Sequence, residues 1–563
     1  MVSRFRTHGL LATLTAVSMA VCTPAVAGDA PANGSVPDGF YDWRGFYAGA
    51  HLGGGLGLAD MGDPYGRSIF GNTVRTPGPI AGGQAGYNWQ HDAAVFGIEA
   101  DASWADLGGT NTCYAYSGYF ISSNCRAGID ALGTLTGRLG YVLPSDGKTL
   151  LYGKAGLAWA TGDLQAIPNG GLQVPGTAES GTEWGWTVGG GVERALSPRW
   201  TVKAEYGFLS FDQGFVAPSS RVQPRPPQPG FEAAPSARTD LSQNVHLIKL
   251  GVNYRLGPAA EMAAGASGDS ASTQGTLARD TMAPGYALTT GARYVYGWGQ
   301  FHKDLGIPNQ GLGSLASRLT YENTDTHGGE AFARLDTPFG LVVKGLVGGG
   351  SSSGALNDED WDLEFGPNEV PYSNTLSGVD NDIRYGIVDV GYALWRGPTH
   401  SITPFVGYAR FEQDMTGLGC RQIANRYSDC NPAFARSVRG ITEDDTWQAL
   451  RLGAAAEAQI APRMSLTADA AYLPYVAFDG TDDHILRNLV SPEDGDGIGV
   501  QLEATLSYAL TDAFSIGVGG RYWAMWTTQG TVNFGGTGTI IPMRYAAEQA
   551  QLLVQGSYRF GGP

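Results

Sequence analysis

AVFGIEADASW, residues 94–104, alternates between apolar and polar side chains. Phe96 and Ile98 fall on one face of an extended chain. Glu99 and Asp101 fall on the opposite face. Successive side chains of a β-strand point to opposite faces of the sheet. The stretch therefore predicts a strand with one apolar face and one charged face.

The same alternation recurs in both halves of the chain. In WTVKAEYGF, residues 200–208, apolar and aromatic residues alternate with Thr, Lys, Glu and Gly. In SIGVGGRYWAMW, residues 515–526, Ile516 and Val518 lie on the face opposite to Arg521. Soluble β-sandwiches also contain alternating strands, so one strand alone does not decide the class. Alternation over about ten residues, with charge inside and aromatic residues near strand ends, is typical of transmembrane β-barrels.

The connections between the strands alternate between short turns and long polar segments. In the first half the long segments are residues 58–78, 106–129, 166–182 and 214–241, which leaves eight strands. In the second half they are about 303–314, 352–380, 414–444, 478–497 and 527–545, which leaves ten strands. Bacterial barrels have even strand numbers, short periplasmic turns and long outer loops. We therefore predict an all-β fold of two tandem antiparallel transmembrane β-barrels, 8-stranded (residues 41–257) and then 10-stranded (residues 284–563).

The start, the middle and the strand ends of the chain indicate export to an outer membrane. Residues 1–27 contain basic residues, an apolar core and a small-residue cleavage site, which predicts a secretory signal peptide. Residues 258–283 are rich in Ala, Gly and Ser, and we expect a flexible periplasmic linker there. Each half ends on an alternating strand that resembles the signal read by the outer-membrane assembly machinery. We predict a Gram-negative outer membrane, with the long loops extracellular.

Charge and cysteine content narrow the expected partners. The formal net charge is −17, and nucleic acid is not an expected partner because its binding depends on basic residues. Outer-membrane lipid is expected instead. The four cysteines beyond the predicted signal peptide predict two local disulfides in an exported protein, Cys113–Cys125 and Cys420–Cys430. We expect no cofactor and no metal site.

Two acidic motifs fall in predicted outer loops of the second barrel. DEDW contains Asp358 and Asp360 after the third strand, and DDH contains Asp482 and His484 after the seventh. These strands lie well apart around a ring of ten, so the two loops can face each other across the mouth. A histidine can accept a proton from water while an adjacent carboxylate stabilises the imidazolium. The four residues are candidates for catalysis, although acidic outer loops also bind divalent cations without catalysing a reaction.

The two halves resemble two different families. DWRGFYAGAHLGGGLG and NVHLIKLGVNYRLG, at the ends of the first half, are similar to small porin-like outer-membrane β-barrel proteins of proteobacteria. The second half, about residues 284–563, resembles the omptin family of ten-stranded outer-membrane proteases, whose pattern combines Asp-x-Asp-Trp with Asp-x-His. The resemblance implies an aspartic-type endopeptidase. In it the couple Asp482–His484 and the pair Asp358–Asp360 activate a water that attacks a peptide carbonyl.

The omptin resemblance also suggests where substrate and lipid would bind. The family carries an acid two positions before its Asp-x-His that helps select a basic residue at the cleavage point, and this sequence has Gly480 there. Asp304 and Asp479 are the candidates to substitute for it in substrate binding. Tyr408 matches part of the family's lipopolysaccharide-binding pattern, so lipopolysaccharide is a candidate partner. The alternative interpretation is a non-enzymatic outer-membrane barrel with a structural, adhesive or porin-like role.

Overall fold

The structure is a computed structural model, and its described part consists almost entirely of β-strands. It describes residues 40–64, 71–116, 121–144, 147–169, 176–218, 220–222, 232–234, 236–256, 285–309, 311–365, 368–397, 400–424 and 430–561. The predicted signal peptide (1–27) and linker (258–283) lie outside these residues. Within the described residues, no helix is long and apolar enough to cross a membrane.

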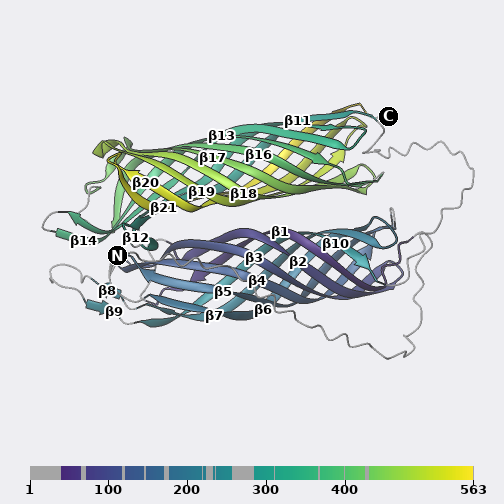
Figure 1. Cartoon of the computed structure of the whole chain (residues 1–563), viewed down its shortest axis with the longest axis horizontal. Coiled ribbons are helices and arrows are strands. Elements are labelled where there is room, and N and C mark those ends of the chain that lie inside the picture. The colour runs from purple at the N-terminus through teal and green to yellow at the C-terminus, as the bar shows by residue number, and fades with distance from the viewer. Residues whose placement is uncertain are drawn as a thin grey trace, which may run out of the picture. The chain divides into compact units, whose positions relative to one another are not determined.

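Eight strands form the first barrel, a closed antiparallel ring (Figure 1). They are β1 (Gly45–Met61), β2 (Thr73–His91), β3 (Ala94–Tyr116), β4 (Ile121–Val142), β5 (Thr149–Pro168), β6 (Thr177–Ala195), β7 (Trp200–Ala217) and β10 (Ala237–Arg255). Pairing of β10 with β1 closes the ring. The short strands β8 (Ser220–Val222) and β9 (Glu232–Ala234) form a hairpin of their own between β7 and β10.

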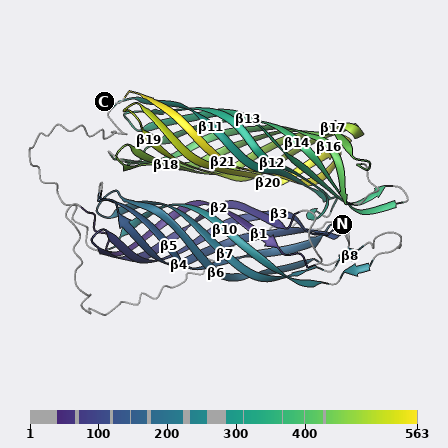
Figure 2. The same ribbon diagram turned by 180° about the vertical axis from the view of Figure 1, so that it is seen from behind.

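Ten long strands form the second barrel, in which each strand crosses the barrel obliquely (Figure 2). They are β11 (Ala287–Ile307), β12 (Gly311–Asp336), β13 (Leu341–Phe365), β14 (Asn368–Tyr392), β16 (His400–Ala424), β17 (Phe434–Ala461), β18 (Met464–His484), β19 (Leu489–Ala509), β20 (Phe514–Phe534) and β21 (Thr539–Phe560). The ring closes because β11 pairs with β21. The short strand β15 (Trp395–Gly397) pairs with the start of β16, and the 3-10 turn η1 (Ile485–Arg487) follows β18. The all-β class and both strand numbers are confirmed.

Apolar and charged side chains lie on opposite faces of the strands, as the alternation predicts. In β3, Phe96 and Ile98 are exposed on the outside of the barrel, whereas Glu99 and Asp101 are buried inside it. An apolar outer face suits contact with lipid, and ring closure leaves no unpaired strand edge in the membrane.

Ion pairs fill the lumen of the first barrel. Its central acids are Glu99, Asp101, Glu193 and Glu205, and its central bases are Arg138, Lys154, Lys203 and Lys249, all of them buried. Lys203 Nζ lies 2.9 Å from Glu99 Oε1, and Lys249 Nζ lies 2.7 Å from Asp101 Oδ1. Pairing of these acids and bases offsets part of the cost of removing each charge from water.

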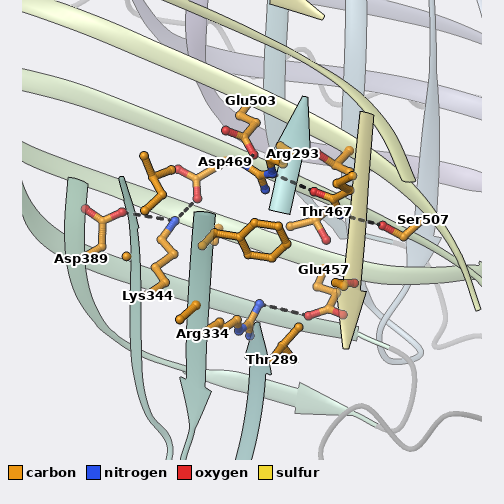
Figure 3. Close-up of a pocket in the computed structure, with 18 of the residues that line it drawn as sticks. Thr289, Arg293, Arg334, Lys344, Asp389, Glu457, Thr467, Asp469, Glu503 and Ser507 are labelled. Carbon is orange, nitrogen blue, oxygen red and sulfur yellow. Dashed lines mark hydrogen bonds and ion pairs between the residues drawn. The ribbon is translucent and has the colours of Figure 1, made fainter. Parts of the chain in front are cut away.

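The second barrel is also charged at the end where its turns are short. A cavity of about 200 Å³ lies there, and Figure 3 shows the ion pairs that line it. Arg334 Nη1 lies 3.1 Å from Glu457 Oε2, and Lys344 Nζ lies 3.4 Å from Asp389 Oδ2. Lys344 also pairs with Asp469. These side chains line this part of the lumen with paired charges.

The expected long loops are mostly strand, so that prediction was wrong. Strands β13 and β14 run through most of residues 352–380, and β18 and β19 run through most of residues 478–497. Where the strands of an outer-membrane barrel extend past its apolar band, their outward side chains face water rather than lipid. Their apolar alternation therefore fades, while the backbone pairing continues. The candidate residues stand on hydrogen-bonded strands, which hold a side chain more firmly than a loop does.

Both predicted disulfides are present. Cys113 on β3 bonds to Cys125 on β4, and Cys420 on β16 bonds to Cys430, which precedes β17. Each bridge joins two neighbouring strands or segments of one barrel. Disulfides of this kind persist in exported proteins, where thiols are not kept reduced.

Candidate active site at the mouth of the second barrel

The two candidate motifs lie on strands that end at the same mouth of the barrel. Asp358 and Asp360 are near the end of β13, and His484 is the last residue of β18. Four antiparallel pairings, through β14, β16 and β17, lead from one strand to the other, so the two strands run in the same direction. Their lumen-facing side chains therefore meet across the barrel.

A β-bulge in β18 turns the second motif into the lumen. Below the bulge Leu473 is buried inside, and above it Val476 is buried inside, three residues later. Their partners on β19 are only two residues apart, so β18 carries one extra residue here. Pro474, which has no N–H to donate to the ladder, lies within the bulge. One extra residue exchanges the two faces of a strand, and this exchange directs Asp482 and His484 inward.

Asp482 and His484 form a bonded couple. His484 Nε2 lies 3.3 Å from Asp482 Oδ2, and the His484 side chain is 22% exposed whereas Asp482 is buried. Burial raises the pKa of Asp482, but the charge of Lys303 and the contact with His484 outweigh it and lower that pKa to about 2. Burial lowers the pKa of His484, but Asp482 and the charge of Asp358 raise it above the usual 6.5. Asp482 is therefore ionised, and His484 can exchange a proton near neutral pH.

Asp358 and Asp360 are adjacent lumen-facing residues of β13. In the ladder they pair with Thr375 and Ser373 of β14. Burial and the charge of Asp360 raise the pKa of Asp358 to about 8. Two carboxylates so close together do not both ionise readily, so the pair keeps one proton at neutral pH. It can then donate one hydrogen bond and accept others.

One cavity of about 380 Å³ joins the two motifs. Asp358, Asp360 and His484 line it, and Asp482 lies behind His484. The remaining wall includes the apolar side chains of Leu356, Phe434, Ile441 and Leu486, the disulfide Cys420–Cys430, and Arg487. A water occupies about 30 Å³ in the liquid, so the cavity is large enough for a water and part of a ligand.

Lys303 of β11 is a neighbour of the couple that the sequence did not reveal. Its Nζ lies 2.7 Å from Asp482 Oδ2 and 3.0 Å from Glu493 Oε1, and it also bonds to Glu443. The segment around it, 303–314, was expected to be a loop. The alternation of Phe301, Lys303 and Leu305 continues β11 into that segment and would have indicated a strand.

Two acidic groups in the described part of the chain bring ligand atoms within 4.8 Å of one another. They are Glu99 with Asp101 and Glu205, and Glu443 with Asp445 and Glu493. Lysines form ion pairs within both groups, so both are charge clusters that already contain a cation.

The two residues proposed for substrate binding do not line the cavity. Asp304 Oδ1 lies 2.6 Å from Arg318 Nε, an ion pair rather than an open acid. Asp479 is exposed, and alternation in β18 directs it away from the face that carries Asp482. Gly480 shares the inner face, where an added Cβ would meet neighbouring side chains at 2.9 Å.

Tyr408, the residue matched to lipopolysaccharide binding, lies on the outer face of β16, as do Arg410 and Glu412. Tyr408 is exposed, and its hydroxyl donates to Gln448 Oε1 at 2.7 Å. Arg410 Nη2 lies 2.6 Å from Glu412 Oε1, and both side chains are partly exposed.

Comparisons with known proteins concern mainly the first barrel. Residues 13–255 match the family described as Outer membrane protein beta-barrel domain. The 31 kDa outer-membrane immunogenic protein of Brucella melitensis is 27% identical over 257 residues, covering 44% of this chain and 98% of that protein. The 22 kDa outer membrane protein of Rhizobium leguminosarum bv. viciae is 33% identical over 175 residues, covering 30% of this chain and 64% of that protein.

This is a bacterial outer-membrane β-barrel protein. The predicted localisation and the resemblance of the first half to small outer-membrane barrels are confirmed at this level. Among solved structures, the outer membrane protease OmpT from Escherichia coli is similar over 49% of this chain and 97% of its own, with a TM-score of 0.41 and 12% identity. A likeness at this level supports no conclusion about activity.

Proposed function

We propose that the mouth of the second barrel is a peptide-hydrolysing site of the omptin type. The observation that carries the proposal is one cavity lined by Asp358, Asp360 and His484, with Asp482 bonded to His484. The omptin-like motifs DEDW and DDH supply these same four residues. The substrate is a peptide segment that reaches the mouth from outside the cell, while membrane lipid surrounds the barrel.

The chemistry requires one water molecule and two proton transfers. With the imidazole proton on Nε2 and directed at Asp482, the Nδ1 atom of His484 is the base. It takes a proton from water as the water oxygen attacks the peptide carbonyl carbon. The imidazolium then gives this proton to the leaving nitrogen as the C–N bond breaks, which releases a carboxylic acid and an amine. The ionised Asp482 stabilises the imidazolium between the two transfers.

The aspartate pair acts on the other side of the water. One proton is shared by Asp358 and Asp360, so one of the two carboxyls is ionised. The ionised carboxyl accepts a hydrogen bond from the O–H of the water that does not face His484. The protonated carboxyl donates to the carbonyl oxygen, on which negative charge develops during the attack. A fixed donor of this kind costs no reorganisation at the moment of reaction.

A non-enzymatic role is the second candidate, and the comparisons favour it for the region that they cover. The names of the Brucella and Rhizobium relatives state an outer-membrane location, and in one case immunogenicity, but no catalytic activity. The matched domain ends at residue 255, before the second barrel begins. We therefore propose a structural or adhesive role for the first barrel, and hydrolysis for the second barrel alone.

Cleavage of a peptide library by the refolded full-length protein tests the proposal, with and without lipopolysaccharide. We expect His484→Ala and Asp358→Asn each to lose about 10²–10⁴-fold in rate, the usual contribution of an acid or base. His327→Ala is the matched control, because His327 is exposed on β12 of the same barrel. Equal cleavage by the wild type and His484→Ala would reject the proposed site, and no cleavage by the wild type would leave the non-enzymatic role.

A further inference from the structure

Four buried acids surround one buried lysine beside the candidate couple. Lys303 contacts Asp482, Glu443 and Glu493, and Asp445 lies within the same group of ligand atoms as the two glutamates. We call the space enclosed by Glu443, Asp445, Asp482 and Glu493 the acidic well. Lys303 is fully buried, so its ammonium is held by these carboxylates rather than by water.

The four acids of the well outnumber its one lysine, and protons on the carboxyls make up part of the difference. Glu443 forms side-chain hydrogen bonds with Glu493 and with Asp445, and a hydrogen bond between two carboxyls requires a proton on one of them. Burial raises the pKa of Glu443, Asp445 and Glu493, and the charge of Lys303 acts in the opposite direction. Raised pKa values favour the uncharged form of these three carboxyls, so the Asp482 carboxylate is the main negative charge that faces the Lys303 ammonium.

The acidic well is closed from below by aromatic side chains. Phe478 precedes Asp482 by two lumen-facing positions on β18, and its ring lies 4.2 Å from that of Tyr545 and 4.5 Å from that of Trp447. All three rings are buried. Phe301, two residues before Lys303 on β11, lies 6.3 Å from the Phe478 ring, so the aromatic layer is next to Lys303 in the lumen.

We propose that Lys303 is a positioning residue whose ammonium fills the acidic well, holds the Asp482 carboxylate against His484, and keeps basic side chains of a substrate out of the well. The first two points concern the chain alone, whereas the last rests on the proposed function. The same oxygen, Asp482 Oδ2, is contacted by both Lys303 Nζ and His484 Nε2. Loss of the ammonium would leave Asp482 among three other acids, with His484 as its remaining cationic partner.

The residue preferred at the cleavage point depends on which space beside the couple can accept a substrate side chain. A Lys or Arg side chain entering the acidic well would meet an ammonium that is already bound there, and like charges repel. The neighbouring cavity instead offers the apolar surfaces of Leu356, Ile441 and Leu486. We expect the preferred residue at the cleavage point to be uncharged and apolar.

Chemical rescue tests the role of Lys303 without any substrate. Refolded Lys303→Ala should unfold at a lower temperature than the wild type, and methylammonium chloride should raise this temperature again by occupying the well. Tetramethylammonium chloride at equal concentration is the salt control, because it has no N–H to donate. Lys344→Ala is the matched control variant, since Lys344 also forms ion pairs with two lumenal acids of this barrel. A Lys303→Ala variant that both salts affect equally would overturn the proposal.

Peptide cleavage tests the effect on specificity, and cleavage by the wild type alone can overturn it. We expect the wild type to cut beside apolar residues, and Lys303→Ala to gain cleavage beside Lys and Arg by about 10-fold or more, the usual size of a specificity step. Wild-type cleavage beside Lys or Arg would overturn the exclusion while leaving the hydrolase proposal intact. If the wild type cuts no peptide, both the proposed hydrolase activity and the proposed specificity are rejected. If methylammonium still raises the unfolding temperature of Lys303→Ala, the positioning role of Lys303 is supported independently.

Discussion

His484 Nε2 lies 3.3 Å from Asp482 Oδ2, and this contact fixes which ring nitrogen faces the cavity. Asp482→Asn keeps the shape of the side chain but removes its charge. An asparagine can also donate to Nε2, which would favour the wrong tautomer, and it cannot stabilise the imidazolium.

We therefore expect Asp482→Asn to lower kcat by about 10²-fold or more with little change in KM, because general acid–base catalysis is worth about 10²–10⁴. Steady-state kinetics on a cleaved library peptide measure this change. Asp483→Asn is the control, because alternation in β18 directs Asp483 to the opposite face. A large rise in KM with unchanged kcat would argue for a role in substrate binding instead.

The rate of cleavage should depend on pH as a bell-shaped curve. His484 must be neutral to accept a proton, and its pKa is raised above 6.5 by Asp482, so the rate should rise with pH above that value. The pair must keep its shared proton, and the pKa of Asp358 is about 8, so the rate should fall above about pH 8. In Asp360→Asn the like charge beside Asp358 is absent, and the alkaline limb should shift to lower pH. An alkaline limb at the same pH in that variant would contradict the assignment.

Asp358 should lower the stability of the fold at neutral and alkaline pH. Its pKa is raised from 3.8 to about 8 in the folded protein. Its contribution to the free energy of unfolding is therefore complete below pH 3.8 and is lost as pH rises toward 8. Asp358→Asn does not titrate. We expect the free energy of unfolding of this variant, relative to the wild type, to increase between pH 4 and pH 8 by at most about 1.4 kcal/mol per pH unit. The unfolding temperatures of the two proteins, measured across this pH range, report the change. A difference that does not vary with pH would indicate that Asp358 is ionised normally.

The Cys420–Cys430 disulfide should matter for the site, because it lines the cavity. Replacing both cysteines with serine should lower cleavage while the barrel still forms, since the ring is held by strand pairing. The matched control is the Cys113/Cys125 double serine variant, whose disulfide belongs to the first barrel. Cleavage and heat-dependent gel migration distinguish activity from barrel formation. Equal losses of activity in both double variants would speak against a local role.

The fold could be predicted from the sequence because side chains that face lipid, such as Phe96, are apolar, and side chains that face the lumen, such as Glu99, are polar or charged. It also singled out Asp358 and His484, since the motifs DEDW and DDH that contain them resemble those of the omptin family. It did not reveal that a bulge at Pro474 exchanges the faces of β18, because inserting one residue leaves the local composition unchanged. Asp479 was a candidate because it is an acid next to Gly480, although it faces outward. Lys303 was missed because its partners lie on β17, β18 and β19, far away in the chain.

The bulge in β18 should be essential for activity but not for the barrel. Deleting Tyr475 removes the extra residue, so the face that carries Asp482 and His484 would turn outward and leave the cavity. Cleavage should then fall by about 10²-fold or more, as on loss of the base itself. Tyr475→Ala keeps the residue count and is the control; it should retain cleavage, because the Tyr475 side chain is exposed on the outside. Heat-dependent gel migration would show that both variants form the barrel. A deletion variant that forms the barrel and cleaves at the wild-type rate would mean that the bulge does not position the couple.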